Sequence, residues 1–291
     1  MGRSALLLVN PLKPAAATAA AEVRGLIEKH GRLIAELPAD NTPLPAVAKD
    51  AELIVVFGGD GTLLSQARRA ALPGTAMLGV NMGRLGFLAE FDMPALREQA
   101  ASIFGTGELV IQEFGLIRVQ IFGPKGDKPR FEEMALNEAV LTAGPPYRMI
   151  TLAFSIDGHN GPTISGDGVI ISSPLGSTAY NLSAGGPILS PFVDGFAITP
   201  IAAHSLSVRP VVVPGNSRIE IKALKANRDS GDPTVGTTLV LDGQVQTPVA
   251  IGDRILITRH ERRIRFVQNP KSDYWSRLIG KMNWATGPKF S

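Results

Sequence analysis

We expect an α/β domain with a Rossmann-like parallel sheet, followed by an all-β-rich domain that resembles a sandwich. Two patterns predict this arrangement. In the first part of the chain, short apolar runs such as Leu53–Phe57 alternate with helix-forming stretches, as in a doubly wound parallel sheet. From about residue 113 onward, apolar residues recur at every second position, as in Ile117, Val119 and Ile121. That period is typical of strands buried on one face.

The change of pattern sets the expected domain limits. We place the α/β domain at residues 1–112, the β-rich domain at residues 113–267 and a terminal segment at residues 268–291. In the terminal segment, apolar residues stand at helical spacing. Residues 274–284 are therefore expected to form a helix that packs on one of the two domains.

Each element of the first domain is expected from its own residues. Short apolar runs predict buried strands, whereas alanine-rich or proline-initiated stretches predict helices. The expected strands are Ala5–Val9, Arg32–Leu37, Leu53–Phe57 and Met77–Asn81, and the expected helices are Ala15–Lys29, Leu63–Ala70 and Pro94–Phe104. Ligands of such sheets bind beyond the carboxyl ends of the strands.

Composition restricts the class of protein. The 291 residues are 44% hydrophobic and 19% charged, with a net charge of +3, which suits small anionic ligands such as nucleotides and falls short of a nucleic-acid footprint. The arginines of residues 259–265 alternate with apolar residues and are interpreted as a solvated strand face. No apolar run approaches the roughly 18 residues of a membrane span. The chain has no cysteine. We therefore expect a cytoplasmic protein that binds neither nucleic acid nor membrane.

The most informative stretch is Gly58-Gly59-Asp60-Gly61-Thr62, which lies between an expected strand and an expected helix. Glycine lets the backbone approach a ligand closely, and the helix start offers free N–H groups to an anion. A carboxylate at this place predicts a base or a metal ligand. A tight turn capped by the aspartate remains the alternative.

Three further stretches carry polar groups that could bind a ligand. Asn81–Phe87 is a glycine-bent loop in which Phe87 is either a stacking platform for a ring or a core residue. Asn137 and Glu138 interrupt an apolar run, so their buried polar groups need partners, which a ribose diol, an adenine edge or an internal hydrogen bond would supply. A second Gly-Asp-Gly, at residues 166–168, precedes a turn at residues 172–187 that is rich in glycine and hydroxyls. This hydroxyl-rich turn suits a polyphosphate, and a solvated loop is the alternative.

Common motifs of other enzyme classes are missing. The chain has no P-loop, because Gly280-Lys281 is followed by Met282, and it has no G-x-S-x-G. Its histidines are His30, His159, His204 and His260, and they form no pair at metal-ligand spacing. We assign no residue as a metal ligand.

Taken together, these stretches resemble the NAD kinase family of bacterial type, whose members phosphorylate the 2′-hydroxyl of the adenosine ribose of NAD to make NADP. The resemblance covers most of the chain and depends on the order of its motifs. They are Gly58–Thr62, Asn81–Leu88, Leu136–Glu138, Gly166–Gly168, Gly176–Tyr180, Leu182–Pro187, His204–Ser207 with Arg209-Pro210, and Asp242–Gln244.

The resemblance implies a role for each matching residue. Asp60 would accept the proton of the 2′-hydroxyl as general base, and Gly61 would lie beside the dinucleotide. Asn137 and Glu138 would hold the adenosine part, Arg148 would contact the ligand, and Asp167 would lie near the nicotinamide end. The dinucleotide site would also be lined by Phe87, Thr178, Ala179, Tyr180, Asn181, Leu182, Ser183, Ala202 and Gln244.

The resemblance also implies partners and architecture. ATP with Mg²⁺ would donate the phosphate, and NAD would accept it. The residue that matches Tyr180 comes from a neighbouring subunit in family members, so a homodimer or homotetramer is implied. The terminal segment would return to the first domain.

The sequence departs from the family pattern in the turn and near the second Gly-Asp-Gly. Leu175 stands where most members have threonine, Ala202-Ala203 replaces a commoner Cys-Pro, and Ser165 stands where a basic residue is frequent. Two alternatives therefore stay open. One is a lipid or sugar kinase that shares the glycine-rich Asp motif, and the other is a dinucleotide-binding regulator without activity.

Overall fold

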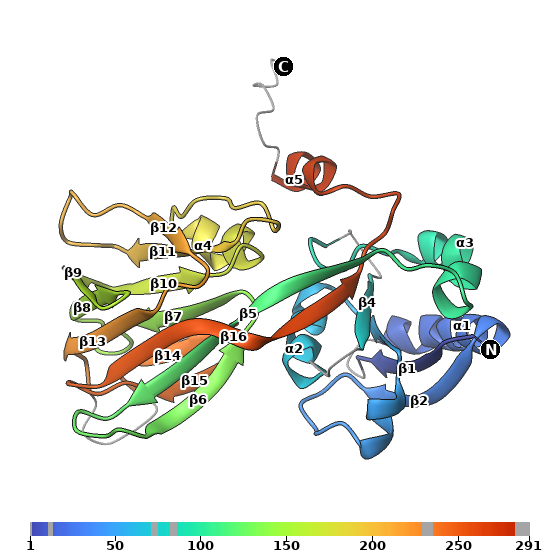
Figure 1. The fold of residues 1–291 in the computed structure, drawn as a ribbon, viewed down its shortest axis with the longest axis horizontal. Helices are drawn as coiled ribbons and strands as arrows, with labels where there is room; N and C mark the ends of the chain where they lie inside the picture. Colours follow the sequence, from blue (N-terminus) through green and yellow to red (C-terminus); the bar gives the residue numbers. More distant parts are fainter. Residues whose placement is uncertain (1, 11–13, 71–74, 82–85, 229–234, 283–291) are drawn as a thin grey trace, which may run out of the picture. The chain divides into compact units, whose positions relative to one another are not determined.

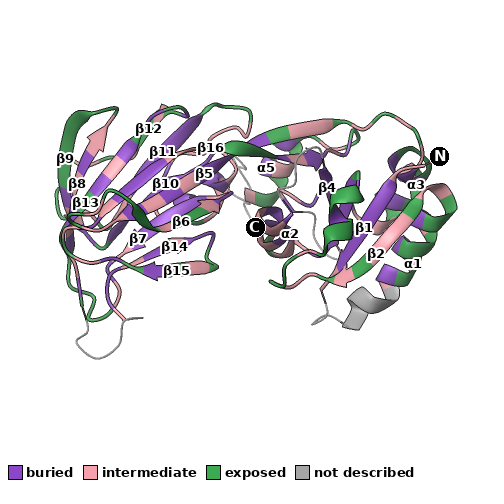
Figure 2. Ribbon diagram, turned by 60° about the horizontal axis from the view of Figure 1, so that its bottom comes forward, coloured by how far each residue is buried: buried purple, intermediate pink, exposed green. Residues whose placement is uncertain are grey.

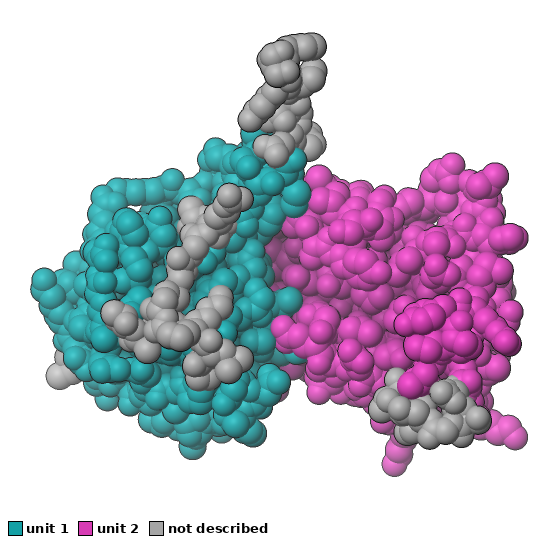
Figure 3. All heavy atoms as spheres, turned by 180° about the vertical axis from the view of Figure 1, so that it is seen from behind, with its two compact units in different colours: residues 1–113, 264–291 teal, residues 114–263 magenta. Residues whose placement is uncertain are grey.

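The computed structural model describes residues 2–10, 14–70, 75–81, 86–228 and 235–282, without the side chains of residues 14–18. The chain divides into two compact units (Figure 3). Unit 1 consists of residues 1–113 and 264–291, and unit 2 consists of residues 114–263. The chain passes between the units within two long strands, β5 (Ile111–Phe122) and β16 (Arg254–Val267).

Unit 1 is built on a parallel sheet in the order β2-β1-β3-β4 (Figure 1). The strands are β1 (Ser4–Val9), β2 (Arg32–Pro38), β3 (Leu53–Phe57) and β4 (Ala76–Val80). The end of β16 adds to the sheet beside β4, where Phe266 pairs with Met77. All residues of β3 and β4 are buried, as expected for strands covered on both faces.

Helices accompany this sheet. They are α1 (Pro14–His30), the 3₁₀ helix η1 (Ala46–Asp50), α2 (Asp60–Arg69), α3 (Met93–Phe104) and α5 (Tyr274–Met282). Both α1 and α3 pack against the sheet. Val23 and Ile27 of α1 share a buried cluster with Leu96 of α3 and with side chains of β1, β3 and β4. Asp92 is the N-cap of α3, and its carboxylate accepts a hydrogen bond from the Ala95 N–H at 2.8 Å.

Unit 2 consists of two antiparallel layers. One sheet has the order β12-β11-β10-β7-β14-β15. Its strands are β7 (Glu138–Thr142), β10 (Gly168–Ser172), β11 (Gly195–Ile201), β12 (Val211–Pro214), β14 (Thr238–Leu241) and β15 (Val245–Pro248). The second layer contains β5, β16, β6 (Pro129–Ala135), β8 (Ile150–Ile156), β9 (His159–Gly166) and β13 (Ile219–Lys225).

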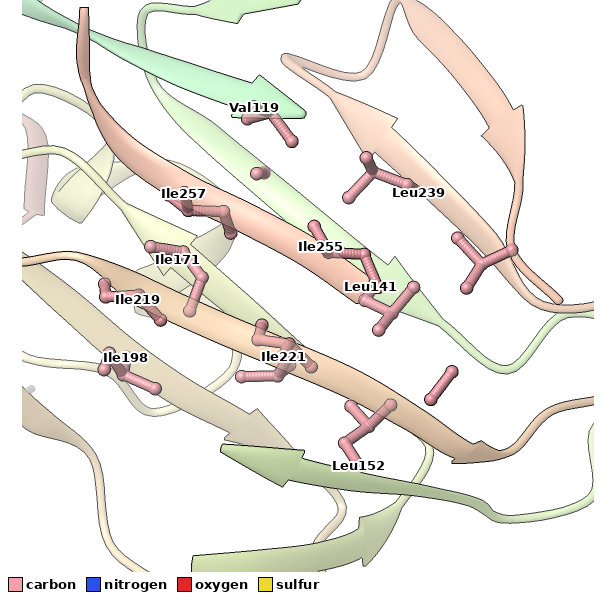
Figure 4. Packing of buried hydrophobic residues seen from close by; sticks show 14 of the residues in the cluster. Val119, Leu141, Leu152, Ile171, Ile198, Ile219, Ile221, Leu239, Ile255 and Ile257 are labelled. Atoms are coloured by element: carbon pink, nitrogen blue, oxygen red, sulfur yellow. The ribbon is translucent and has the colours of Figure 1, made fainter. Parts of the chain in front are cut away.

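A single apolar cluster fills the space between these layers (Figure 4). Leu141 and Ile171 contribute from one sheet, and Ile221 and Ile255 contribute from the other. Along β13 the buried residues alternate with more exposed ones (Figure 2). Two short helices interrupt this β-rich unit: η2 (Gly176–Thr178) and α4 (Tyr180–Ser183).

The fold class predicted from the sequence is confirmed: an α/β part with a parallel sheet and a β-rich part with antiparallel sheets. The hydroxyl-rich turn contains the helical turns η2 and α4, which the sequence did not predict because each is shorter than two helical periods. Part of the Asn81–Phe87 loop, residues 82–85, lies outside the described residues, as do residues 283 and 284 of the expected terminal helix.

Candidate active site

The Gly58–Thr62 stretch lies where β3 ends and α2 begins. Gly59 is the N-cap of α2 and Asp60 is its first residue. The Gly58 N–H donates to the Val80 carbonyl at 2.9 Å, so the turn is tied to the end of the neighbouring strand β4. Asp60 is thereby fixed at the carboxyl edge of the parallel sheet, where such folds bind ligands.

The Asp60 carboxylate accepts hydrogen bonds from three consecutive backbone N–H groups. Phe87 N lies 2.7 Å from Oδ2, and Leu88 N and Ala89 N lie 3.1 and 3.0 Å from Oδ1. These bonds fix the orientation of the carboxylate. Because each carboxylate oxygen has two acceptor positions, Oδ2 keeps one for a further donor.

Two glycines show how closely this carboxylate is approached. A Cβ on Gly86 would lie 1.7 Å from Oδ1 of Asp60, so any other residue there would displace the carboxylate. A Cβ on Gly61 would meet no atom within 4 Å. Gly61 is exposed, and no steric contact with the described residues requires a glycine there. Close approach of a ligand is one reason for a glycine at this position.

Phe87 is half-buried. Its burial therefore does not decide between the two predicted roles, a stacking platform for a ring and a core residue. Its ring is covered by the Lys281 ammonium of α5, which lies 4.8 Å from the ring centroid. This is the geometry of a cation–π contact.

Asp242 of unit 2 accepts three consecutive backbone N–H groups in the same manner. Leu136 N donates to Oδ2 at 2.9 Å, and Asn137 N and Glu138 N donate to Oδ1 at 2.8 and 3.1 Å. Asp242 has a positive φ of 51° in the turn between β14 and β15. It therefore holds Asn137 and Glu138 at the start of β7.

Asn137 and Glu138 are consecutive residues, and the side chain of each has a polar atom without a hydrogen-bond partner among the described residues. Oδ1 of Asn137 and Oε2 of Glu138 are buried and have no hydrogen-bond partner among the described residues. Burial, followed by the nearby charge of Asp242, raises the pKa of Glu138 to about 8. Buried polar atoms without partners are rare in native proteins, and a bound ligand is one explanation for them.

The hydroxyl-rich turn packs against the backbone of residues 136 and 137. Ser173 Oγ donates to the Leu136 carbonyl at 2.6 Å, and a Cβ on Gly176 would lie 2.2 Å from the Asn137 carbonyl oxygen. Asn181 is fully buried. Its amide donates to the carbonyls of Ser177 and Pro187, and its Oδ1 accepts from Thr199. The side chain of Asn181 is thus used within the chain, where it holds the turn on β11.

The other predicted residues of the turn surround this region. Tyr180 is 48% exposed and Ser183 is exposed, whereas Thr178, Ala179 and Leu182 are half-buried. Gln244 is exposed and lies two residues beyond Asp242. All of them belong to the end of the sheet at which β7 begins and β10 ends, since Glu138 pairs with Ser172.

Three predicted residues lie at the opposite end of these strands. Asp167 directly precedes Gly168, which pairs with Thr142 and Ile201 at the far ends of β7 and β11. Ala202 follows Ile201 and has a positive φ of 45°. Arg148 is exposed on the loop after β7, and its carbonyl accepts the Asn227 amide at 2.6 Å. Within one chain the structure therefore separates Asp167, Ala202 and Arg148 from the region of Asn137 and Glu138.

Two structural roles escaped the sequence analysis. Asn227 is buried and donates to the carbonyls of Ala143, Gly144 and Arg148, which fixes the loop that carries Arg148. Asp242 braces residues 136–138 from over a hundred positions away. The Asp242-Gly243 pair predicts a turn, but no local pattern reveals which amides the carboxylate accepts.

Among the described residues, no group of three or more His, Asp or Glu side chains could hold a metal ion. No helix in the described part of the chain could span a membrane.

Two family models and several known proteins match this chain. Residues 39–109 match the model of the ATP-NAD kinase N-terminal domain, and residues 136–269 match that of the ATP-NAD kinase C-terminal domain. An NAD kinase of Desulforamulus reducens is 36% identical over 266 residues, which cover 91% of this chain and 89% of the relative. An NAD kinase of Geotalea daltonii is 40% identical over 242 residues, covering 82% of this chain and 80% of the relative.

Two solved structures share the fold. An NAD kinase from Archaeoglobus fulgidus in complex with ATP aligns with a TM-score of 0.72 at 27% identity, covering 97% of this chain and 98% of that one. Yeast NADH kinase complexed with NADH aligns with a TM-score of 0.84 at 22% identity, covering 100% of this chain and 90% of that one.

The two matched domains define the class of protein, which is an enzyme of the kinase type. The chain belongs to the ATP-NAD kinase family, and its enzyme class is that of the NAD⁺ kinases.

Replacing Gly61 by alanine tests whether the turn faces a ligand. The added Cβ meets no atom of the chain, so we expect Gly61→Ala to keep or raise the free energy of unfolding, by up to about 1 kcal/mol, because alanine favours helices. Kinase activity (kcat/KM for the dinucleotide) should nevertheless fall at least about tenfold, because small displacements of bound substrate are costly to rate. Gly25→Ala in α1 is the matched control, since its Cβ is also in open space. Equal activity of the two variants would contradict a ligand at Gly61.

The raised pKa of Glu138 predicts a specific pH dependence of stability. Between the ordinary pKa of 4.5 and about 8, the unfolded chain ionises Glu138 while the folded chain keeps it protonated, so this group lowers stability progressively as pH rises. We expect the gain in unfolding free energy from Glu138→Gln to grow by about 2–4 kcal/mol between pH 5 and pH 9, at roughly 1.4 kcal/mol per pKa unit.

Denaturant unfolding at both pH values measures this difference. Glu133→Gln, at an exposed position of β6, serves as the control for the loss of one carboxylate. A pH-independent effect of Glu138→Gln would show that Glu138 is not desolvated in the folded protein.

Proposed function

We propose that this enzyme transfers a phosphoryl group from ATP to the 2′-hydroxyl of the adenosine ribose of NAD, giving NADP, as a cytoplasmic enzyme. The observation that carries the proposal is the pair of buried atoms at Asn137 and Glu138 that have no partner among the described residues. The same chain carries Asp60 at the start of helix α2, directly after strand β3. Ribose hydroxyls both donate and accept hydrogen bonds, and so they match an amide oxygen and a carboxyl group.

Asp60 acts as the general base in this proposal. A ribose hydroxyl is a weak nucleophile, and phosphoryl transfer depends on positioning and charge neutralisation. The three amides that bind Asp60 hold its carboxylate in one orientation, and the remaining acceptor position on Oδ2 can take the hydroxyl proton as the new P–O bond forms. Gly61 and Phe87 flank the position of the ribose.

Glu138 has a protonated carboxyl group below about pH 8, so it can donate a hydrogen bond as well as accept one. With Asn137 it holds the adenosine part of NAD. Gln244 and the turn residues line the remainder of the dinucleotide site: Thr178, Ala179, Tyr180, Asn181, Leu182 and Ser183. Because the side chain of Asn181 is used within the chain, its contribution is to shape the turn.

Mg²⁺ enters as part of the donor substrate. A divalent ion on ATP offsets phosphate charge and demands few protein ligands, because it keeps several waters and binds mainly phosphate oxygens. The structure of an Archaeoglobus fulgidus NAD kinase in complex with ATP supports ATP as the donor. The ligand of the yeast enzyme, NADH, supports a nicotinamide dinucleotide as the acceptor.

The predicted dinucleotide-site residues of unit 2 lie at two opposite ends of its strands, and this separation supports a homo-oligomer. Asp167, Ala202 and Arg148 lie at one end of the five-residue strand β10, and Asn137 and Glu138 lie at the other, roughly 13–17 Å away at about 3.3 Å per residue. A second copy can bring its Asp167 end to the Asn137 end of the first, as homodimers and homotetramers with closed symmetry do. Tyr180, exposed on its turn, is free to reach the neighbouring ligand.

Asp60→Asn tests the general base. We expect kcat for NADP formation from NAD, ATP and Mg²⁺ to fall by about 10²–10⁴, the usual contribution of general base catalysis, while the calorimetric Kd for NAD changes only a few-fold. Asp92→Asn is the matched control, because Asp92 is also a carboxylate at a helix start in unit 1. Full activity of Asp60→Asn would remove Asp60 from this role.

The unaltered protein decides between the alternatives in the same assay. Binding of NAD without turnover would indicate a regulator, and phosphorylation of a lipid or sugar in place of NAD would indicate another kinase.

Mixed oligomers test the shared site. We expect Asp60→Asn and Asp167→Ala each to have little activity alone, because each spoils every site. Co-expressed with different affinity tags and purified through both, they should recover about a quarter to a half of normal activity, since each mixed pair contains one site free of both changes. No recovery in doubly tagged oligomers would place Asp60 and Asp167 in the site of one subunit.

A further inference from the structure

Two cationic side chains of the C-terminal helix α5 contact the segment that holds Asp60. Nη1 of Arg277 lies 2.5 Å from Oε1 of Glu90, and Nζ of Lys281 lies 4.8 Å from the centroid of the Phe87 ring. Arg277 and Lys281 are four residues apart, so they lie on the same side of the helix.

The Arg277–Glu90 pair is nearly enclosed by protein. The side chain of Glu90 is 4% exposed and that of Arg277 is 11% exposed. The second carboxylate oxygen of Glu90 accepts the Asn269 N–H at 2.9 Å, and the Asn269 amide donates to the Glu90 carbonyl at 3.3 Å. Burial raises the pKa of Glu90, while Asn269 and Arg277 oppose this change. Removing Arg277 would leave a buried acid without its counter-charge, a severe disturbance at this one place.

Glu90 lies immediately after the three amides that Asp60 accepts. Ala89 N donates to Oδ1 of Asp60, and the Ala89 carbonyl accepts the Gly86 N–H at 3.1 Å, which closes a tight turn. On the far side, Phe91 N donates to the Gly79 carbonyl at 3.4 Å and so fixes the segment to β4. Residues 86–91 are therefore held by Asp60, by β4 and by α5.

We propose that α5 clamps residues 86–90 and that Arg277 is a positioning residue for phosphoryl transfer. Arg277 holds Glu90, Glu90 fixes the amides of residues 87–89, and these amides orient the Asp60 carboxylate. Lys281 adds a second contact through the Phe87 ring. The inference rests on the proposed function only in taking Asp60 as the reacting carboxylate.

The Lys271–Glu98 pair provides a control that distinguishes a specific clamp from the general effect of losing one surface cation. It also joins the C-terminal segment to unit 1, at 2.5 Å, but both side chains are 59% exposed and neither touches residues 86–90. Exposed pairs of this kind contribute little to stability. Lys271→Ala is thus a matched control for the loss of one cation from the same segment.

Amide hydrogen exchange and steady-state kinetics test the clamp together. In Arg277→Ala we expect exchange of the Phe87, Leu88 and Ala89 amides to speed up by about tenfold or more relative to the β1 amides of Leu6–Leu8. The kcat should fall about 10- to 100-fold with the KM for NAD changed less than about threefold, because positioning of the base is lost rather than substrate binding. Arg277→Lys should restore most of both, and Lys271→Ala should match the unaltered protein.

Lys281→Ala keeps the test decisive if Arg277→Ala folds poorly, since Lys281 is exposed. It should change exchange and kcat in the same direction by a smaller factor. Unchanged exchange at residues 87–89 in both variants would overturn the proposal. Equal acceleration at residues 87–89 and at Leu6–Leu8 would also overturn it, because α5 would then stabilise unit 1 as a whole. The exchange result stands even if no kinase activity is found, and so it fails or succeeds independently of the proposed function.

Discussion

The hydrogen bonds between the Asp60 carboxylate and the N–H groups of residues 87–89 are the contact on which the candidate active site depends. They join two strand ends of the parallel sheet, because Asp60 follows β3 and residues 87–89 follow β4. They also require glycine at position 86, where a side chain would collide with the carboxylate. The Asp60 carboxylate is thereby oriented by backbone groups, which cannot rotate away as side chains can.

Unit 2 contains a similar arrangement, in which a carboxylate accepts three consecutive backbone N–H groups. Asp242 accepts the N–H groups of residues 136–138 and so fixes the start of β7. In unit 1 the carboxylate itself is the candidate reacting group, whereas in unit 2 the carboxylate of Asp242 holds two candidate binding residues, Asn137 and Glu138. Burial, followed by the negative charge of Asp242, raises the pKa of Glu138. Asp242 therefore fixes the position of Glu138 and adds to the effect of burial on its ionisation.

The orphaned atoms of Asn137 and Glu138 illustrate a balance between folding and binding. A buried polar atom without a partner destabilises the folded chain by an amount comparable to a lost hydrogen bond. A ligand that supplies the missing partners recovers this free energy on binding, and the binding site is then stabilised by its substrate. Asn181 is the contrasting case, because all its polar atoms bond within the chain and it serves the architecture of the turn.

The sequence by itself determined the fold class, because the change from strand–helix alternation to period-two alternation is a local property of the chain. It also located the strand-to-helix turn at Asp60 and the polar pair Asn137 and Glu138, each with a buried polar atom, since glycines and interrupted apolar runs are visible without coordinates. Only the tertiary structure decided which groups these residues contact. The bonds from residues 87–89 to Asp60, the brace from Asp242 and the Arg277–Glu90 pair all join positions far apart in the chain. No local pattern encodes such pairings, because they arise only when strand ends and the C-terminal helix are brought together by folding.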